Sequence, residues 1–219
     1  MRVGVLGTGQ VGRTLGTRLV ADGHEVTLGS RRDDHPEAIA WAEASGGLAS
    51  HGTFAAACRG AELLVNATPG RVSLEVLASV DAGDLDGVTL LDVSNPLDFS
   101  NGFPPSLTVC NTDSLGEQIQ AAHPGLRVVK ALNTMNHAIM VDPGSLPGLH
   151  HVFVCGNEAA AKAEIRALLA GWGWSDEAIV DLGDISNARG VEMMLPLWVR
   201  IYASIGTGDF NLAIVTAPE

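Results

Sequence analysis

The chain has 219 residues, of which 46% are hydrophobic and 17% are charged. A chain of this length normally folds as one domain or as one domain with a small addition, and its apolar content excludes an intrinsically disordered protein. The 25 acidic and 13 basic residues give a net charge of −12, which argues against binding to nucleic acid or to anionic membranes. No apolar run approaches the roughly 18 residues that would span a bilayer.

Short apolar segments alternate along the chain with longer helical patterns. Strands are predicted over residues 2–6, 25–29, 63–66, 89–93, 128–132, 151–155 and 179–182. Helices are predicted over residues 11–21, 36–45, 72–80, 114–123, 158–169 and 189–205. This alternation is typical of an α/β protein with a doubly wound parallel sheet, the Rossmann NAD(P)-binding fold, here followed by a mostly helical C-terminal extension. We expect residues 1–150 to form the dinucleotide-binding domain, and residues 151–219 to continue the sheet and add a helix for an acceptor site or a dimer.

The first predicted strand ends in a GxGxxG loop, which consists of Gly7, Thr8, Gly9, Gln10, Val11 and Gly12. Between a strand and a helix, this pattern is typical of dinucleotide binding. Gly7 permits the tight turn, Gly9 lets the backbone approach a pyrophosphate, and Gly12 allows the helix to pack closely on the sheet. The free amides and the dipole of the helix N-terminus favour the phosphates. The alternative is a tight turn without a ligand.

The end of the second predicted strand bears on which dinucleotide binds. NAD sites usually place an acidic residue there, whereas this chain has Gly29 followed by Ser30, Arg31 and Arg32. Guanidinium and hydroxyl groups bind a 2′-phosphate, which a carboxylate would repel. The sequence therefore predicts NADP(H), although a solvated turn with two surface arginines is the alternative. The two aspartates that follow, at positions 33 and 34, are expected to face solvent.

The loops after the later strands should converge on the same crevice, because ligands bind beyond the carboxyl ends of the strands in an open α/β sheet. On this basis we predict further contacts to the dinucleotide from Ala67, Thr68, Pro69, Asn95, Ala131 and Asn133. For the loop at residues 67–70, a purely structural strand-to-helix turn explains the sequence equally well.

The wall that faces the hydride acceptor is predicted to contain Asn133, Thr134, Met135, Asn136, His137 and Trp198. His137 is the histidine nearest to the crevice and is a possible catalytic residue; capping a helix or facing water is the alternative. Hydride transfer to a conjugated ring needs alignment rather than a side-chain acid. Trp198 lies in an apolar helical stripe that could face the core, a dimer partner or the cleft, and Pro196 should kink this helix. The sequence has no metal-ligand spacing, so we expect no metal.

Three cysteines are widely spaced, at positions 58, 110 and 155, and form no CxxC motif. We expect them to be reduced, buried thiols of a cytoplasmic protein.

With these motifs in order, the chain resembles the NADPH-dependent reductases of coenzyme F420, a deazaflavin, and in particular their bacterial branch. The shared segments are the glycine loop, residues 29–32, the loop at 67–69, Asn95-Pro96, and residues 130–134, 181–184, 188–192 and 206–211. The resemblance implies a homodimer in which the deazaflavin stacks on the nicotinamide and exchanges a hydride reversibly with NADPH. Residues 135–138 depart from the family pattern, in which smaller and less polar residues are expected.

Because of this departure, other readings stay open. The acceptor could be a flavin, a ferric chelate, or a small imine or carbonyl compound, and the protein could also be a non-catalytic NADP(H) sensor. The reductase domain of membrane metalloreductases, which uses NADPH and a flavin, is a broader relative with the same scaffold.

Overall fold

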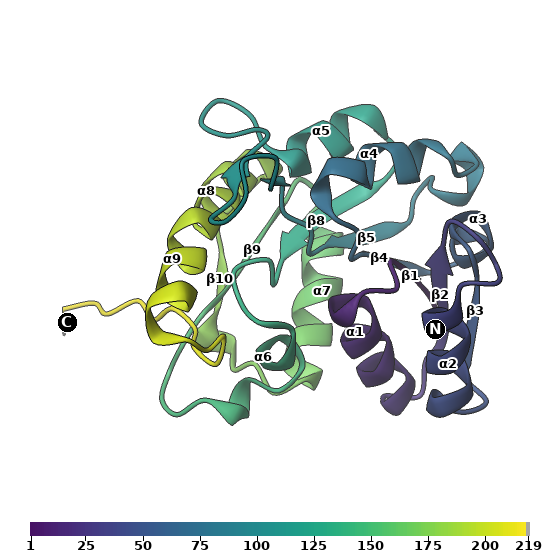
Figure 1. The fold of residues 1–219 in the computed structure, drawn as a ribbon, viewed down its shortest axis with the longest axis horizontal. Coiled ribbons are helices and arrows are strands. Elements are labelled where there is room, and N and C mark those ends of the chain that lie inside the picture. The colour runs from purple at the N-terminus through teal and green to yellow at the C-terminus, as the bar shows by residue number, and fades with distance from the viewer. Residues whose placement is uncertain (218–219) are drawn as a thin grey trace.

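The computed structural model describes residues 1–217, which form a twisted sheet covered by helices on both faces (Figure 1). The strands of this sheet are β1 (Arg2–Leu6), β2 (Glu25–Ser30), β3 (Ala49–Thr53), β4 (Leu63–Asn66), β5 (Thr89–Asp92), β8 (Arg127–Ala131), β9 (Val152–Gly156) and β10 (Ile179–Asp181). They lie in the order β10-β9-β8-β5-β4-β1-β2-β3. Two short strands, β6 (Leu97–Asp98) and β7 (Ser106–Leu107), form a separate antiparallel hairpin after β5.

Two groups of helices cover the two faces. The α-helices are α1 (Gln10–Ala21), α2 (Pro36–Ser45), α3 (Phe54–Cys58), α4 (Gly70–Ala78), α5 (Leu115–Ala122), α6 (His137–Val141), α7 (Ala159–Gly171), α8 (Ala188–Met193) and α9 (Leu195–Ile205). Short 3-10 turns are η1 (Ala82–Asp84), η2 (Pro143–Ser145), η3 (Asp176–Ala178) and η4 (Ile185–Asn187). Buried residues of α1, α2, α6 and α7 form one hydrophobic core, and those of α3, α4, α5 and α8 form the other. None of the helices within residues 1–217 is both long enough and apolar enough to cross a lipid bilayer.

The central strands explain why there are two cores. Successive side chains of a strand point to opposite faces of the sheet. In β4, Leu63 and Val65 therefore enter the core under α1, while Leu64 enters the core under α4. In β5, Leu91 and Leu90 divide in the same way. Strands that are buried on both faces read as continuous apolar runs, which is why they were visible in the sequence.

The predicted fold is confirmed, with two corrections in the sheet. The strand β3 was missed because its sequence, ASHGT, is polar and because it lies at the sheet edge with much of its surface exposed. The sheet is parallel as predicted except at one pair, since β9 runs antiparallel to β8. The connection through α6 and η2 does not cross back to the amino end of the sheet, so β9 starts beside the end of β8. The next strand, β10, is again parallel to β9.

The stretch that was predicted as one helix kinked at Pro196 is divided into two helices, with only Met194 between them. Helix α8 ends at Met193 and α9 begins at Leu195, with the proline in its first turn, where its missing N–H is tolerated. The prediction that all three thiols are buried is wrong at one position: Cys58 and Cys155 are buried, but Cys110 is exposed in the loop before α5. Burial raises the pKa of Cys58 and that of Cys155 to about 12, so these two thiols stay protonated.

Candidate functional site

A cleft of about 810 Å³ opens at the carboxyl ends of the central strands. The residues that line it and were predicted to bind the cofactor are Gly7, Thr8, Gly9, Gln10, Val11, Ser30, Arg31, Arg32, Ala67, Thr68, Pro69 and Asn95. Three others of that set, Gly12, Ala131 and Asn133, are buried and do not line it. The volume falls within the roughly 300–1,000 Å³ typical of ligand pockets.

The glycine loop has the geometry that a dinucleotide requires. Gly7 has a φ of +119°, and its N–H donates to the Gly29 carbonyl at 3.0 Å. Gly9 caps α1 and lines the cleft, and a Cβ there would meet no protein atom within 4 Å. That Cβ would instead project into open space at the helix N-terminus, where a phosphate would sit. A Cβ at Gly12 would lie 2.1 Å from the Gly7 carbonyl oxygen. The loop therefore fits a pyrophosphate: the protein itself excludes a side chain at Gly7 and Gly12, whereas Gly9 leaves open space that a ligand can occupy.

The end of β2 presents an unpaired cation to the cleft. The Ser30 hydroxyl accepts from the Arg32 N–H at 3.1 Å and donates to the Arg32 carbonyl, which fixes the turn. Arg32 forms an exposed ion pair with Asp34 at 3.3 Å. Within residues 1–217, Arg31 makes neither an ion pair nor a side-chain hydrogen bond, and it lines the cleft. Asp33 and Asp34 are exposed, as predicted. A free guanidinium beside a held hydroxyl can bind a phosphate.

The loop after β4 is held by buried hydrogen bonds. The Thr68 hydroxyl donates to Asn66 Oδ1 at 2.7 Å and lies 2.9 Å from the Ser73 hydroxyl of α4. Asn66 in turn donates to Asp92 Oδ1 at 2.9 Å. The Thr68 hydroxyl is thus already used within the protein, and it holds the loop in shape.

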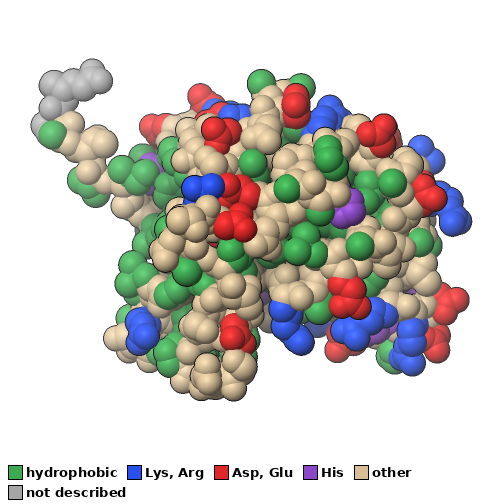
Figure 2. Space-filling view, turned by 90° about the horizontal axis from the view of Figure 1, so that it is seen from above, with side chains coloured by type: hydrophobic (Ala, Val, Ile, Leu, Met, Phe, Trp, Pro, Cys, Tyr) green, Lys and Arg blue, Asp and Glu red, His purple; other side chains and the backbone are tan. Residues whose placement is uncertain are grey.

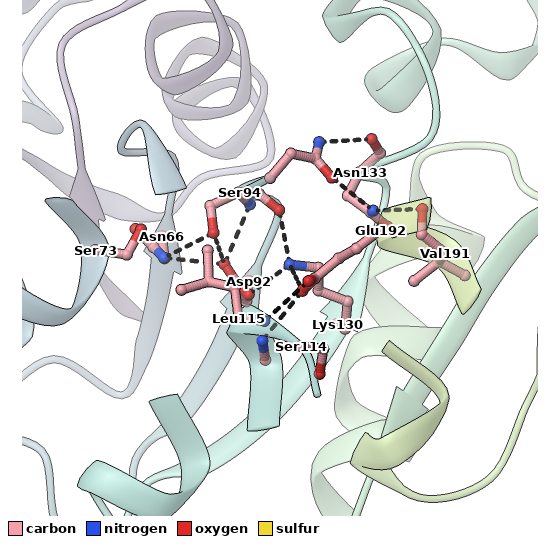
Figure 3. Close-up of polar contacts among 12 residues, drawn as sticks. Asn66, Ser73, Asp92, Ser94, Ser114, Leu115, Lys130, Asn133, Val191 and Glu192 are labelled. Atoms are coloured by element: carbon pink, nitrogen blue, oxygen red, sulfur yellow. Dashed lines mark hydrogen bonds and ion pairs between the residues drawn. The ribbon is translucent and has the colours of Figure 1, made fainter. Parts of the chain in front are cut away.

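A buried ion cluster lies behind the cleft, made of Asp92, Lys130 and Glu192 (Figure 3). Lys130 Nζ lies 2.8 Å from each carboxylate, and the three side chains are at most 1% exposed. Burial alone would lower the pKa of Lys130, but the charges and hydrogen bonds of Asp92 and Glu192 hold it above its ordinary value. Glu192 also accepts from the backbone N–H groups of Leu115 and Gly116, at 2.9 and 3.1 Å. The N-terminus of α5 thereby offsets the second carboxylate.

The turn after β8 packs against the loop after β5. Asn95 donates to the Asn133 carbonyl and accepts from Asn133 Nδ2, both at 2.9 Å. Asn133 Nδ2 also donates to the Val191 carbonyl of α8 at 3.2 Å. Leu132, which lies between the end of β8 and Asn133, has a φ of +63°. This left-handed conformation costs a non-glycine residue about 1–3 kcal/mol and persists only where the surrounding structure fixes it. These contacts hold the turn after β8 against the loop after β5 and against helix α8.

The predicted acceptor wall does not line the cleft. Thr134 and Met135 are buried, and Gly208 of the C-terminal segment approaches Asn136 so closely that a Cβ would lie 2.5 Å from its Nδ2. His137 begins α6, lies 2.9 Å from the Thr14 hydroxyl through Nδ1, and borders a separate open groove between α1, α2 and α6. Burial lowers the pKa of His137.

Trp198, the remaining residue of the predicted wall, belongs to an aromatic stack. Its ring lies 5.7 Å from that of Tyr202 and 5.2 Å from that of Phe210, close to parallel in both pairs. The stack holds the C-terminal segment against α9 rather than facing the cofactor cleft.

Sequence reasoning missed several cleft residues. Arg71 and Val72 come from the first turn of α4, while Leu97 and Phe99 come from the β6–β7 hairpin and its loop. Both segments directly follow strand ends at which ligand contacts were expected, and this position is the signal that could have found them. No group of three or more possible metal-ligating side chains occurs within residues 1–217.

Comparison with known proteins identifies the same family that the sequence motifs resemble. The family described as NADP oxidoreductase, coenzyme F420-dependent, matches residues 2–96. A solved structure of a candidate F420-dependent NADP reductase from Arthrobacter sp. FB24 is 48% identical with a TM-score of 0.92, and the match covers 99% of this chain and 100% of that one.

Curated relatives point to reductases. The F420-dependent NADP reductase of Methanothermobacter marburgensis is 26% identical over the full length of both chains. Metalloreductase STEAP3 of Rattus norvegicus is 29% identical over 90% of this chain, but the chain spans only 38% of that protein. A reductive aminase from Aspergillus terreus in complex with NADPH shares the fold, with a TM-score of 0.66 at 19% identity over 94% of this chain and 62% of that one.

Proposed function

We propose that this chain, which belongs to the coenzyme F420-dependent NADP oxidoreductase family, transfers a hydride between NADPH and the deazaflavin F420. The observation that carries the proposal is the cleft, in which the glycine loop and the unpaired Arg31 face the same space. The 48% identity over the whole chain to a candidate F420-dependent reductase supports the deazaflavin as the acceptor.

Different residues of the cleft would bind different parts of NADPH. The backbone of Gly7–Val11 would hold the pyrophosphate, and Ser30 and Arg31 would hold the 2′-phosphate with help from Arg32. NADPH, when bound, supplies the hydride. The loop at Ser94 and Asn95 would support the nicotinamide end, and apolar side chains such as Val72 and Leu97 would exclude water from the reacting faces. A conjugated acceptor ring needs only alignment, so the absence of an acid or base among the described cleft residues other than His35 and arginines is compatible with this chemistry.

The predicted acceptor wall remains part of the proposal in a modified form. Asn133 is its nearest link to the cleft, through the paired hydrogen bonds with Asn95. Thr134, Met135, Asn136, His137 and Trp198 would act by packing behind this link rather than by touching the cofactor. The acceptor would enter beside Asn95, where Phe99 of the hairpin loop stands 56% exposed at the cleft.

We also propose that the protein is a homodimer of a reducing compartment such as the cytoplasm. Exposed apolar side chains gather on the last two helices and the C-terminal segment, namely Met193, Leu197, Tyr202, Ile205, Ile214 and Val215. Figure 1 shows the C-terminal segment leaving the body beside α9, and in Figure 2 hydrophobic side chains lie along the part of the chain that projects from the body. A second copy of the chain would cover such a patch. The three cysteines are free thiols.

A second candidate acceptor is a flavin or ferric chelate, which the 29% identity to a metalloreductase favours. Anaerobic absorbance assays with NADPH and, separately, F420, FMN, a ferric chelate and a small cyclic imine distinguish these acceptors. The proposal expects the fastest turnover with F420, in both directions. Turnover confined to flavin and iron would replace the acceptor, whereas tight NADPH binding without turnover would indicate a sensor.

A further inference from the structure

Among residues 1–217, Lys130 is the largest fully buried side chain. Its Nζ lies 2.8 Å from Asp92 Oδ2, 2.8 Å from Glu192 Oε1 and 2.7 Å from the Ser94 carbonyl oxygen (Figure 3). A backbone carbonyl and two carboxylates can only accept hydrogen bonds, so all three N–H bonds of a protonated ammonium are used. Lys130 therefore has no proton to offer a substrate, and its role must be exerted through its partners.

Those partners belong to three different elements. Asp92 ends β5, Ser94 lies in the following loop, which lines the cleft, and Glu192 lies on α8 of the C-terminal extension. The other Asp92 oxygen, Oδ1, accepts from the Ser94 N–H at 3.1 Å and from its hydroxyl at 2.6 Å, and also from Asn66 at 2.9 Å. The Ser94 residue is thus held at its amide, its hydroxyl and its carbonyl by one ion pair.

Three residues after Lys130, Asn133 forms a second link between the same parts of the protein. Asn133 joins the Asn95 side chain and the Val191 carbonyl, so the loop after β5 and helix α8 are again bridged. The left-handed Leu132 lies between the two links. The buried contacts of Lys130 and Asn133 hold the chain on both sides of this residue, as a left-handed non-glycine conformation requires.

We propose that Lys130 is a positioning residue for the nicotinamide end of the cleft, fastening the Ser94–Asn95 loop to helix α8 so that the cofactor support and the C-terminal extension form one rigid unit. This inference rests on the proposed NADPH-dependent hydride transfer. Sub-ångström placement of the nicotinamide matters because a displacement of about 1 Å can reduce a reaction rate by about 100-fold.

The test uses a double variant, Lys130→Met with Asp92→Asn. Replacing Lys130 alone leaves two buried carboxylates without a cation and risks unfolding. The double variant keeps the net charge of the cluster at −1, as in the wild type, while it removes the ammonium from the Ser94 carbonyl. Lys162→Met is the matched control, because Lys162 also joins a carboxylate and a carbonyl, those of Asp181 and Gly183, but does not line the cleft.

Two readouts separate positioning from general damage. Binding of 2′,5′-ADP reports only the half of the cleft that holds the adenosine and its 2′-phosphate, whereas single-turnover reduction of F420 by NADPH reports the nicotinamide end. For the folded double variant we expect 2′,5′-ADP affinity close to that of the wild type, and hydride transfer about 100-fold slower at saturating NADPH. In steady-state turnover, NADPH deuterated at the transferred position should show a larger isotope effect in this variant than in the wild type, since slowed hydride transfer then limits the steady-state rate. Lys162→Met should leave both readouts unchanged.

Wild-type rates in the double variant would overturn the inference, and so would equal losses of 2′,5′-ADP binding and turnover. If the double variant does not fold, Glu192→Gln, which weakens the same link from the side of α8, is measured with the same expectation and the same refutation. If the wild type itself does not reduce F420, the proposed function fails. The inference is then decided by binding: the variant must weaken NADPH more than 2′,5′-ADP.

Discussion

Replacing Arg31 by alanine should change the choice between the two nicotinamide dinucleotides. Arg31 lines the cleft and, within the described residues, makes no ion pair or side-chain hydrogen bond. Its loss therefore breaks no contact within the protein, and the whole effect should fall on the ligand. A hydrogen bond to a charged group contributes about 1.5–3 kcal/mol, which corresponds to about tenfold to 150-fold in affinity.

Exposure moves the expected effect to the lower part of this range. Water and salt screen a guanidinium at the surface, so we expect NADPH affinity to fall by about 10- to 40-fold. NADH lacks the 2′-phosphate, and its affinity should hardly change. Arg32 already pairs with Asp34 at 3.3 Å, so Arg32→Ala should have a smaller effect and serves as the matched control.

Fluorescence titration of NADPH and NADH into the wild type and both variants measures the effect, at low and at high ionic strength. The difference between the two dinucleotides should shrink as salt is added to the wild type, and little of this salt dependence should remain in Arg31→Ala. Equal weakening of both dinucleotides would show that Arg31 acts on the pyrophosphate or on the fold. A larger loss in Arg32→Ala would mean that the 2′-phosphate lies on the other arginine, and the assignment would be refuted.

The cofactor half of the cleft could be predicted because its signals are local. The glycine loop and the turn at Ser30 each lie within a few residues of a strand end. Their geometry is therefore determined by residues that are neighbours in the sequence. The parallel order of the central strands follows from the alternation of strands and helices. The edge strand β3 carries no such pattern, since an exposed edge needs few apolar side chains.

The positions of the predicted acceptor-wall residues relative to the cleft could not be read from the sequence, because they depend on contacts between distant segments. A strand ending at Ala131 should open into the crevice, but the left-handed turn at Leu132 directs the next residues into the core. The buried partners of Lys130 are Asp92 of β5 and Glu192 of α8, and no pattern in the sequence near Lys130 predicts these ion pairs. The antiparallel return into β9 likewise depends on the path of a connection rather than on the residues of the strand.

Three further predictions follow from single contacts. Gly12→Ala would place a Cβ 2.1 Å from a backbone carbonyl oxygen, so it should lower the melting temperature, cost about 1–3 kcal/mol of stability, and weaken NADPH binding. His137→Asn should cost less than about 100-fold in kcat, the low end of general acid–base catalysis, because the His137 side chain contacts Thr14 of α1 and does not line the cleft. A loss of about ten-thousandfold would instead assign it a proton-delivering role. Glu117→Gln should make the free energy of unfolding less dependent on pH in the acidic range. The hydrogen bond from Arg189 of α8 lowers the pKa of Glu117 below its ordinary value, so the folded state favours the ionised carboxylate. That stabilisation is complete above the unfolded pKa of about 4.3 and is lost as the pH falls through the lower, folded pKa. Urea unfolding should therefore show the wild type to be more stable than Glu117→Gln at pH 7, with the difference shrinking below about pH 4.3. A difference that stays constant or grows on acidification would mean that Glu117 is not held ionised by Arg189.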